Sequence, residues 1–174
     1  MVRTVVILLL ALLSLSSANS ANISASFQHL SGTHWAVDLE TSNDGDPPVI
    51  TGFTIYFPAA LFSSLSVANS PAQWDSIVIQ PDLGLASPGF FDSFITNPGS
   101  ALLPGQTATG FRVEVQFLGI GSPPMLQFEI VDQNFNVQFT GLTSAPIPEP
   151  TTLALLLAGI VCVLVRTRKR HTRQ

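Results

Sequence analysis

The sequence predicts an all-β fold, an antiparallel two-sheet β-sandwich of about eight or nine short strands between residues 22 and 142. Apolar and polar residues alternate with a period of two along several stretches, which is typical of strands with one buried face. Turn residues interrupt these stretches about every 8–12 residues, a spacing that favours a sandwich. Prolines and glycines are so frequent in the middle of the chain that they leave no room for a long helix.

Three runs in the second half of the chain show the alternation most clearly. They span residues 111–117, 126–130 and 135–139, with an apolar residue at every second position. The polar turn Asp132-Gln133-Asn134 predicts a hairpin between the last two runs, and a longer loop joins the first two. We therefore expect an antiparallel meander of three strands.

The first half of the chain shows the same alternation of apolar and polar residues less regularly. Gly32 separates two alternating runs, and the turn-rich stretch 43–48 precedes a third. A helix of one or two turns near residues 58–66 is an alternative to a strand there. The expected strands are 23–27, 35–39, 53–57, 61–67, 76–80 and 90–95.

Residues 1–21 have the organisation of a secretory signal peptide and are expected to form a signal helix. Arg3 gives a positive charge, residues 5–15 form an apolar core, and small residues follow. This order predicts export by a Sec-type machinery and cleavage between residues 18 and 22. The body, residues 22–142, would then fold outside the cytoplasm. The alternative is a retained N-terminal anchor.

Three segments follow the body without a gap. Residues 143–150 form a small-residue linker, expected to be extended and accessible, that ends in Pro148-Glu149-Pro150, which no helix can run through. Residues 151–165 are uncharged and apolar, and at about 1.5 Å per residue they would make a transmembrane helix of roughly 22 Å. Residues 166–174 form a basic tail with the cluster Arg166, Arg168, Lys169 and Arg170. Because basic residues beside a span stay in the cytoplasm, we expect an anchored precursor. A buried helix is the alternative for the apolar run.

The proline-flanked glutamate, the apolar run and the terminal basic cluster together resemble the PEP-CTERM sorting signal of Gram-negative bacteria. The resemblance covers about the last 28 residues. It implies an exosortase, a membrane-embedded cysteine transpeptidase-like protease, as a partner that processes the chain near Pro148, Glu149 and Pro150. The carrier would then be released or transferred at the cell surface, often in strains that make exopolysaccharide. Four residues after the basic cluster lengthen the tail beyond this pattern.

The charges are divided unevenly along the chain. Between residues 22 and 145 there are ten acidic residues and one basic residue, Arg112, which gives a net charge of −9 at neutral pH. Such a body repels nucleic acids and other polyanions. The one cysteine, Cys162, lies in the apolar run, so the body has no disulfide and must fold by burial alone. No cofactor is expected.

Candidate catalytic residues are few, and we expect a body that is not an enzyme. His29 should point inward and His34 outward, which makes a shared metal site awkward. Glu114 and Glu129 should lie on the outer face of neighbouring strands, where a solvated acidic face is favoured over a glycosidase pair. No Gly-x-Ser-x-Gly nucleophile elbow occurs.

The loop at residues 43–46 and the two tryptophans are further candidate binding features, but structural roles are favoured for them. Asp44 and Asp46 are weak metal candidates, because residues 43–46 have half of a calcium-loop pattern but no closing glutamate. A plain turn is favoured there. Trp35 and Trp74 could stack on sugars, although packing in the core is favoured for both.

Three functions remain open for the body. The first is a structural or adhesive protein, held as an inner-membrane precursor with a periplasmic body and then sorted to the cell surface or extracellular matrix. The second is a carbohydrate-binding module of the exopolysaccharide matrix, which predicts an exposed aromatic pair on one sheet face. The third is a secreted hydrolase, which needs a cleft with convergent polar groups.

Overall fold

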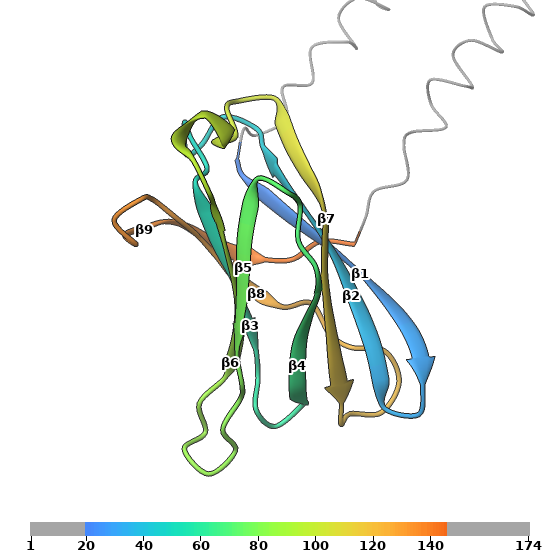
Figure 1. The fold of residues 1–174 in the computed structure, drawn as a ribbon. Helices are drawn as coiled ribbons and strands as arrows, with labels where there is room; N and C mark the ends of the chain where they lie inside the picture. Colours follow the sequence, from blue (N-terminus) through green and yellow to red (C-terminus); the bar gives the residue numbers. More distant parts are fainter. Residues whose placement is uncertain (1–19, 146–174) are drawn as a thin grey trace, which may run out of the picture.

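Two antiparallel β-sheets face each other in the computed structural model, which describes residues 20–145 (Figure 1). The predicted all-β sandwich is confirmed. The expected signal helix, except for its last two residues, and the expected helix 151–165 lie outside the described residues. Within residues 20–145, no helix has the length and apolar character needed to cross a bilayer.

One sheet has four strands and the other has five. The first, in spatial order, contains β1 (Asn22–Ser31), β2 (His34–Asn43), β7 (Gln106–Phe117) and β4 (Phe62–Asn69). The second contains β5 (Trp74–Ile79), β6 (Gly89–Ile95), β3 (Gly52–Phe57), β8 (Gln127–Val131) and β9 (Val137–Leu142). A single 3-10 turn, η1 (Pro98–Ser100), precedes β7 in the described part of the chain.

The core lies between the sheets and is built from the alternating residues that the sequence singles out. In β3, Phe53, Ile55 and Phe57 are fully buried, and in β7 Phe111 and Val113 are buried opposite them. The Phe53 and Phe111 rings meet edge to face with centroids 5.0 Å apart, so an aromatic contact joins the two sheets. Such pairs add about 0.5–1.5 kcal/mol to the free energy gained from burial alone.

The predicted three-strand meander is wrong in its first step. β7 pairs with β2 and β4, whereas β8 pairs with β3 and β9, so β7 and β8 lie in opposite sheets. The loop between them, residues 118–126, crosses from one sheet to the other. Alternation shows which face of a strand is buried, but it does not identify the neighbouring strand. The predicted β8–β9 hairpin is confirmed.

The helical alternative for residues 58–66 is also not observed. The backbone N–H groups of Leu61 and Phe62 both donate to the Pro58 carbonyl, at 2.9 and 3.0 Å, which makes one tight turn. The chain then enters β4 at Phe62, whose side chain is fully buried. Burial of Phe62 against β7 therefore takes precedence over any local helix preference.

The end of the body is fastened to its beginning. Ser144 lies beside β1 in a parallel bridge, where it donates to the Ile23 carbonyl at 2.9 Å and accepts from the Ala25 amide at 2.8 Å. The Asn22 side chain donates to the Ser144 hydroxyl at 3.0 Å. Thr143 is buried, with 1% of its surface exposed. Thr143 and Ser144 are thus held by the body, although the sequence predicts an accessible linker from residue 143 on.

Candidate binding groove on the five-stranded sheet

The outer face of the five-stranded sheet carries a groove rather than a plain polar surface. Side chains alternate across a strand, so the positions between the core residues of β3, β6 and β8 face outward. The register places Thr54 of β3 between Asp92 of β6 and Glu129 of β8. The groove has a volume of about 220 Å³ here, and its lining comprises Thr54, Tyr56, Phe90, Asp92, Phe94, Glu129, Val131, Phe135 and Val137.

Two hydrogen bonds order the polar floor of the groove. The Thr54 hydroxyl donates to Asp92 Oδ1 at 2.6 Å, and the Tyr56 hydroxyl donates to Glu129 Oε2 at 2.8 Å. Burial raises the pKa of Asp92, and the Thr54 hydrogen bond lowers it by less. Burial, together with the hydrogen bond to and the charge of Glu129, raises the pKa of Tyr56 to about 12. The floor therefore carries concentrated negative charge in a partly desolvated setting.

Two aromatic pairs stand around this floor. The Phe94 and Phe135 rings have centroids 4.9 Å apart at an interplanar angle of 57°, and the Tyr56 and Phe90 rings lie 6.2 Å apart at 58°. Phe135 is 70% exposed, and the other three are half-buried. The sequence offers only Trp35 and Trp74 as candidates for exposed aromatic residues, and neither belongs to these pairs. Phe90 and Phe94 lie one and three positions from buried Phe91, so their side chains point to the other face of β6. This alternation is the sequence signal that could locate the groove.

A β-bulge in β9 brings Phe135 and Val137 to the groove. Ile130 pairs with Phe139, but the next partner of β8, Val131, pairs with Val137, so one residue is added on β9. A one-residue shift moves side chains to the other face of a sheet. The predicted common face for Phe135, Val137 and Phe139 is therefore wrong. Phe139 packs toward the core beside Phe128, whereas the other two face outward.

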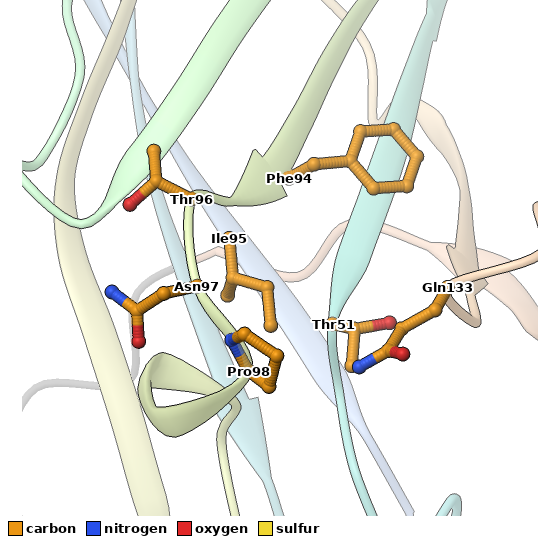
Figure 2. Close-up of a pocket in the computed structure, with 7 residues that line it drawn as sticks. All are labelled: Thr51, Phe94, Ile95, Thr96, Asn97, Pro98 and Gln133. Carbon is orange, nitrogen blue, oxygen red and sulfur yellow. The ribbon is translucent and has the colours of Figure 1, made fainter.

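Gly52 lets the Phe94 ring lie close against the sheet. A Cβ atom on Gly52 would come within 2.4 Å of the Phe94 ring, so only a glycine leaves room for this ring position. Figure 2 shows the adjoining hollow, with the ring at one side and Thr51 and Gln133 close together beneath it. This hollow has a volume of about 200 Å³, and it is lined by Thr51, Phe94, Ile95, Thr96, Asn97, Pro98 and Gln133.

A third hollow continues the groove at its other end. It has a volume of about 390 Å³, and its lining comprises Tyr56, Pro58, Ala59, Ala60, Leu83, Ala86, Pro88 and Gln127. Tyr56 is shared with the central hollow, and Phe94 joins the central hollow to the one in Figure 2. Because each end hollow shares one lining residue with the central hollow, the three hollows are named together the outer-face groove.

The acidic and histidine candidates from the sequence are not brought together. Glu114 is on β7 and Glu129 on β8, in opposite sheets, so the predicted neighbouring pair is wrong. His29 is exposed, not inward, and its Nε2 lies 2.8 Å from the Gly32 carbonyl at the end of edge strand β1. His34 is half-exposed, and its Nε2 lies 3.1 Å from Glu114 Oε2. Among residues 20–145, no three histidine, cysteine or acidic side chains gather as metal ligands would.

The turn at residues 43–46 is shaped by Asn43. Its side-chain oxygen accepts from the Gly45 amide at 2.9 Å, and its amide group donates to the Leu102 carbonyl at 2.8 Å. This is the plain Asx turn that the sequence favours. Asp44 and Asp46 are both exposed.

The tryptophans are largely inside the molecule. Trp74 has 6% of its surface exposed and contacts Phe111 edge to face, with centroids 5.2 Å apart. Trp35 is half-buried, with its ring 4.9 Å from that of His29. Neither residue lines the outer-face groove.

The predicted sorting residues lie outside the described residues: Pro148, Glu149, Pro150, Arg166, Arg168, Lys169 and Arg170. Their assignment rests on the sequence comparison. The family model of the PEP-CTERM protein-sorting motif matches residues 146–169. The chain therefore carries a C-terminal sorting signal. This match confirms the resemblance of the tail to the PEP-CTERM sorting signal.

Solved structures provide distant likenesses to the sandwich. One is a family 3b carbohydrate-binding module from the biomass sensoring system of Clostridium clariflavum, with 11% identity and a TM-score of 0.44 over 75% of this chain and 100% of that one. A cohesin module from a Clostridium perfringens family 33 glycoside hydrolase has 8% identity and a TM-score of 0.44 over 74% and 98%. The sixth cohesin of Acetivibrio cellulolyticus scaffoldin B has 9% identity and a TM-score of 0.39 over 74% and 99%.

With TM-scores below 0.5, these likenesses carry no conclusion about what the chain binds. No curated protein matches the sequence.

Proposed function

We propose that this chain is an exported surface or extracellular-matrix protein whose tail is processed by an exosortase. The observation that carries this proposal is the sorting motif at residues 146–169. The signal-like residues 1–21 support it, because export must precede sorting at the membrane. The precursor is anchored in the inner membrane with a periplasmic body, and the processed form reaches the surface or the medium.

The body of the mature protein has a structural or adhesive role and is not an enzyme. Its sandwich is held by a continuous core, and it carries ten acidic residues against one arginine, so it stays soluble and repels polyanions. The hydrolase alternative loses its candidate pair, because Glu114 and Glu129 lie in opposite sheets.

Substitution of the sorting tripeptide tests this proposal. In cells with the exosortase, replacement of Pro148, Glu149 and Pro150 by alanine should leave the full-length chain in the membrane fraction, whereas the wild-type protein reaches the surface or medium. Replacement of Pro124 by alanine, at an exposed loop position outside residues 146–169, is the control and should not change sorting. Equal distribution of all three proteins would refute a role for the tripeptide.

A second candidate function, binding of matrix carbohydrate, is favoured by one observation. The outer-face groove exposes two aromatic pairs, Phe94 with Phe135 and Tyr56 with Phe90, beside hydrogen-bonding side chains. Exposed aromatic rings with a few placed polar groups are the usual composition of a ligand site. Affinity electrophoresis in gels that contain the producer's own polysaccharide should retard the wild-type protein more than a Phe94→Ala variant. Equal mobility with and without polysaccharide would exclude this function.

A further inference from the structure

We propose that the outer-face groove binds a glycan that carries free amino groups, such as a polymer of glucosamine units. The inference rests on the carbohydrate-binding candidate above and goes beyond it by naming the ligand's charge. Three features of the groove carry it: uncompensated carboxylates on the floor, aromatic rings around them, and a length that exceeds one sugar ring.

Within residues 20–145, the carboxylates of the groove lack a cationic partner. Asp92 and Glu129 each use one oxygen for the bonds from Thr54 and Tyr56, and no bond within residues 20–145 reaches Asp92 Oδ2 or Glu129 Oε1. The described residues contain only three basic side chains, all in the four-stranded sheet: His29, His34 and Arg112. The Arg112 guanidinium is held by both oxygens of Asp38, at 3.0 and 3.1 Å. This sheet face therefore favours a ligand that brings a positive charge.

Burial makes this charge preference stronger than on an open surface. The pKa of Asp92 is raised by burial, and that of Tyr56 is raised to about 12 by burial and by Glu129. The shift of Asp92 shows that burial makes its carboxylate costly to ionise, and the shift of Tyr56 shows in addition that a second negative charge beside Glu129 is unfavourable. A protonated amine placed beside Asp92 and Glu129 relieves this cost, whereas an acidic polysaccharide would add to it. The net charge of −9 on the body acts in the same direction at long range.

The aromatic rings favour a sugar over a small inorganic cation. Rings offer a flat apolar surface to the C–H face of a sugar and a negative face to an ammonium group within about 6 Å. Phe135 is held in this wall with a positive φ of 62°, a conformation that a bulky residue rarely adopts. Because Gly52 has no side chain, the Phe94 ring can lie directly on β3.

The groove is long enough for several sugar units. From Phe90 to Phe94 the outer face of β6 spans about 13 Å at roughly 3.3 Å per residue. The hollows at both ends extend it, with volumes of about 390 and 200 Å³. An oligomer can thus place one amino group over the floor while neighbouring units contact the aromatic pairs.

Calorimetric titration of the full chain, purified in mild detergent, tests the inference. The two probes are a short glucosamine oligomer and the same oligomer fully N-acetylated, at a pH where the amines are protonated and the carboxylates ionised. We expect the free-amine oligomer to bind at least about tenfold more tightly, which corresponds to about 1.4 kcal/mol. Its affinity should fall as salt is added, because the contact is between charges.

Three charge variants separate binding in the groove from general attraction to an acidic protein. Asp92→Asn with Glu129→Gln keeps acceptors for the Thr54 and Tyr56 hydroxyls, so the fold should persist, and binding should weaken about tenfold or more. Glu129→Gln alone should show a smaller loss, which keeps the test valid if the double variant misfolds. Glu40→Gln removes one charge from the exposed face of β2 in the other sheet and should leave the affinity unchanged.

Several outcomes would overturn the inference. Equal binding of the two oligomers would make the groove a neutral-sugar site, and equal losses in Glu40→Gln and Glu129→Gln would make the binding non-specific. Equally tight binding of a lysine-rich peptide, lost in the same double variant, would make it a general cation site. If neither oligomer binds but the producer's polysaccharide still does, the carbohydrate function survives and only the amino-sugar assignment fails.

Discussion

Gly52 and Gly141 both lie directly under phenylalanine rings, but on opposite faces of the five-stranded sheet. A Cβ on Gly52 would come within 2.4 Å of Phe94, which is half-buried on the outer face. A Cβ on Gly141 would come within 2.8 Å of Phe128, which is 2% exposed and part of the core. The same added methyl group therefore has different consequences at the two positions.

Alanine substitution should separate these two roles. Gly52→Ala should displace the Phe94 ring toward solvent, with little loss of stability but with weaker binding of any ligand in the groove. Gly141→Ala should reduce the free energy of unfolding by about 1–3 kcal/mol, because Phe128 has no free space to enter. Urea unfolding measures the loss of stability in each variant, and an equal loss in the two variants would contradict this assignment of faces.

Two buried threonines provide a second contrast between residues. Thr41 Oγ1 is buried without a hydrogen-bond partner in the described part of the chain. Thr143 Oγ1 accepts from the Leu126 amide at 2.9 Å, which ties the end of the body to the residue just before β8. The first hydroxyl is a cost to the fold and the second satisfies a buried donor.

Valine at each position should therefore change stability in opposite directions. We expect Thr41→Val to raise the free energy of unfolding by about 1 kcal/mol, and Thr143→Val to lower it by about 1–3 kcal/mol because the Leu126 N–H is left unpaired. Thermal unfolding of the two variants, measured beside the wild-type protein, tests both changes in stability. Destabilisation by Thr41→Val would show that its hydroxyl has a partner after all.

At the scale of elements, the β8–β9 hairpin is organised by one carboxylate. Asp132 accepts from the Asn136 side chain at 3.1 Å and from the Asn134 and Asn136 amides at 2.8 and 2.9 Å. The side-chain and backbone bonds from Asn136 hold the pKa of Asp132 below its usual range. This turn also carries Phe135 into the outer-face groove.

The lowered pKa fixes the direction of a pH effect. A carboxylate whose folded pKa lies below its unfolded value adds stability above the unfolded pKa, and that stability is lost as the pH falls through the folded pKa. Asp132→Asn should therefore lower the Tm near neutral pH, and the difference from wild type should shrink toward acidic pH. Asp44→Asn, which removes an exposed carboxylate that makes no hydrogen bond within residues 20–145, should have no effect. A Tm difference that is constant with pH would contradict this role.

Strand existence and the β8–β9 hairpin could be predicted from the sequence, but the pairing of β7 with its neighbours could not. The alternation in β3, β7 and β8 identified their buried faces, because burial of every second residue is a local property of a strand. The assignment of β7 and β8 to one sheet failed because a connection of nine residues is long enough to cross the sandwich, whose sheets lie about 10 Å apart. Which strands become neighbours depends on how the whole set of strands packs together.

The outer-face groove could be predicted only in part. The outward phase of Tyr56, Phe90 and Phe94 can be read from the alternation once the buried faces are known. The positions of Phe135 and Val137 depend on the bulge in β9. A period of two does not show where a strand carries an extra residue, so the sequence pattern could not predict this bulge. Thr54, Asp92 and Glu129 are far apart in sequence and meet only through the register of three strands.

At the scale of the whole molecule, an aromatic cluster replaces the disulfide that many exported domains use. Phe111 of β7 contacts Phe53, Trp74 and Phe91 of the other sheet, with ring centroids 5.0, 5.2 and 6.5 Å apart. With no cysteine among residues 22–145, the attachment of the two sheets depends on such contacts.

Removal of this ring should accordingly have a large effect. Phe111→Ala should reduce the free energy of unfolding by about 3–5 kcal/mol and weaken the near-ultraviolet circular dichroism of Trp74. Phe90→Ala removes a half-buried ring from the outer face and should cost much less. Equal losses from the two substitutions would contradict a core centred on Phe111.

The course of the chain also connects the body to its sorting signal. Ser144, paired with β1, lies four residues before Pro148, so the signal begins within roughly 14 Å of chain from a fixed point on the body. Because the Asn22 side chain donates to the Ser144 hydroxyl, the beginning and the end of the body lie side by side. Processing near the tripeptide would leave this sandwich intact.

Intact-mass analysis of the protein from cells that make it tests the central claim most directly. The account predicts a mature species that has lost the signal-like residues 1–21 and whose C-terminus lies near residues 148–152. A full-length species that still ends at Gln174, with no truncated form beside it, would contradict sorting by an exosortase.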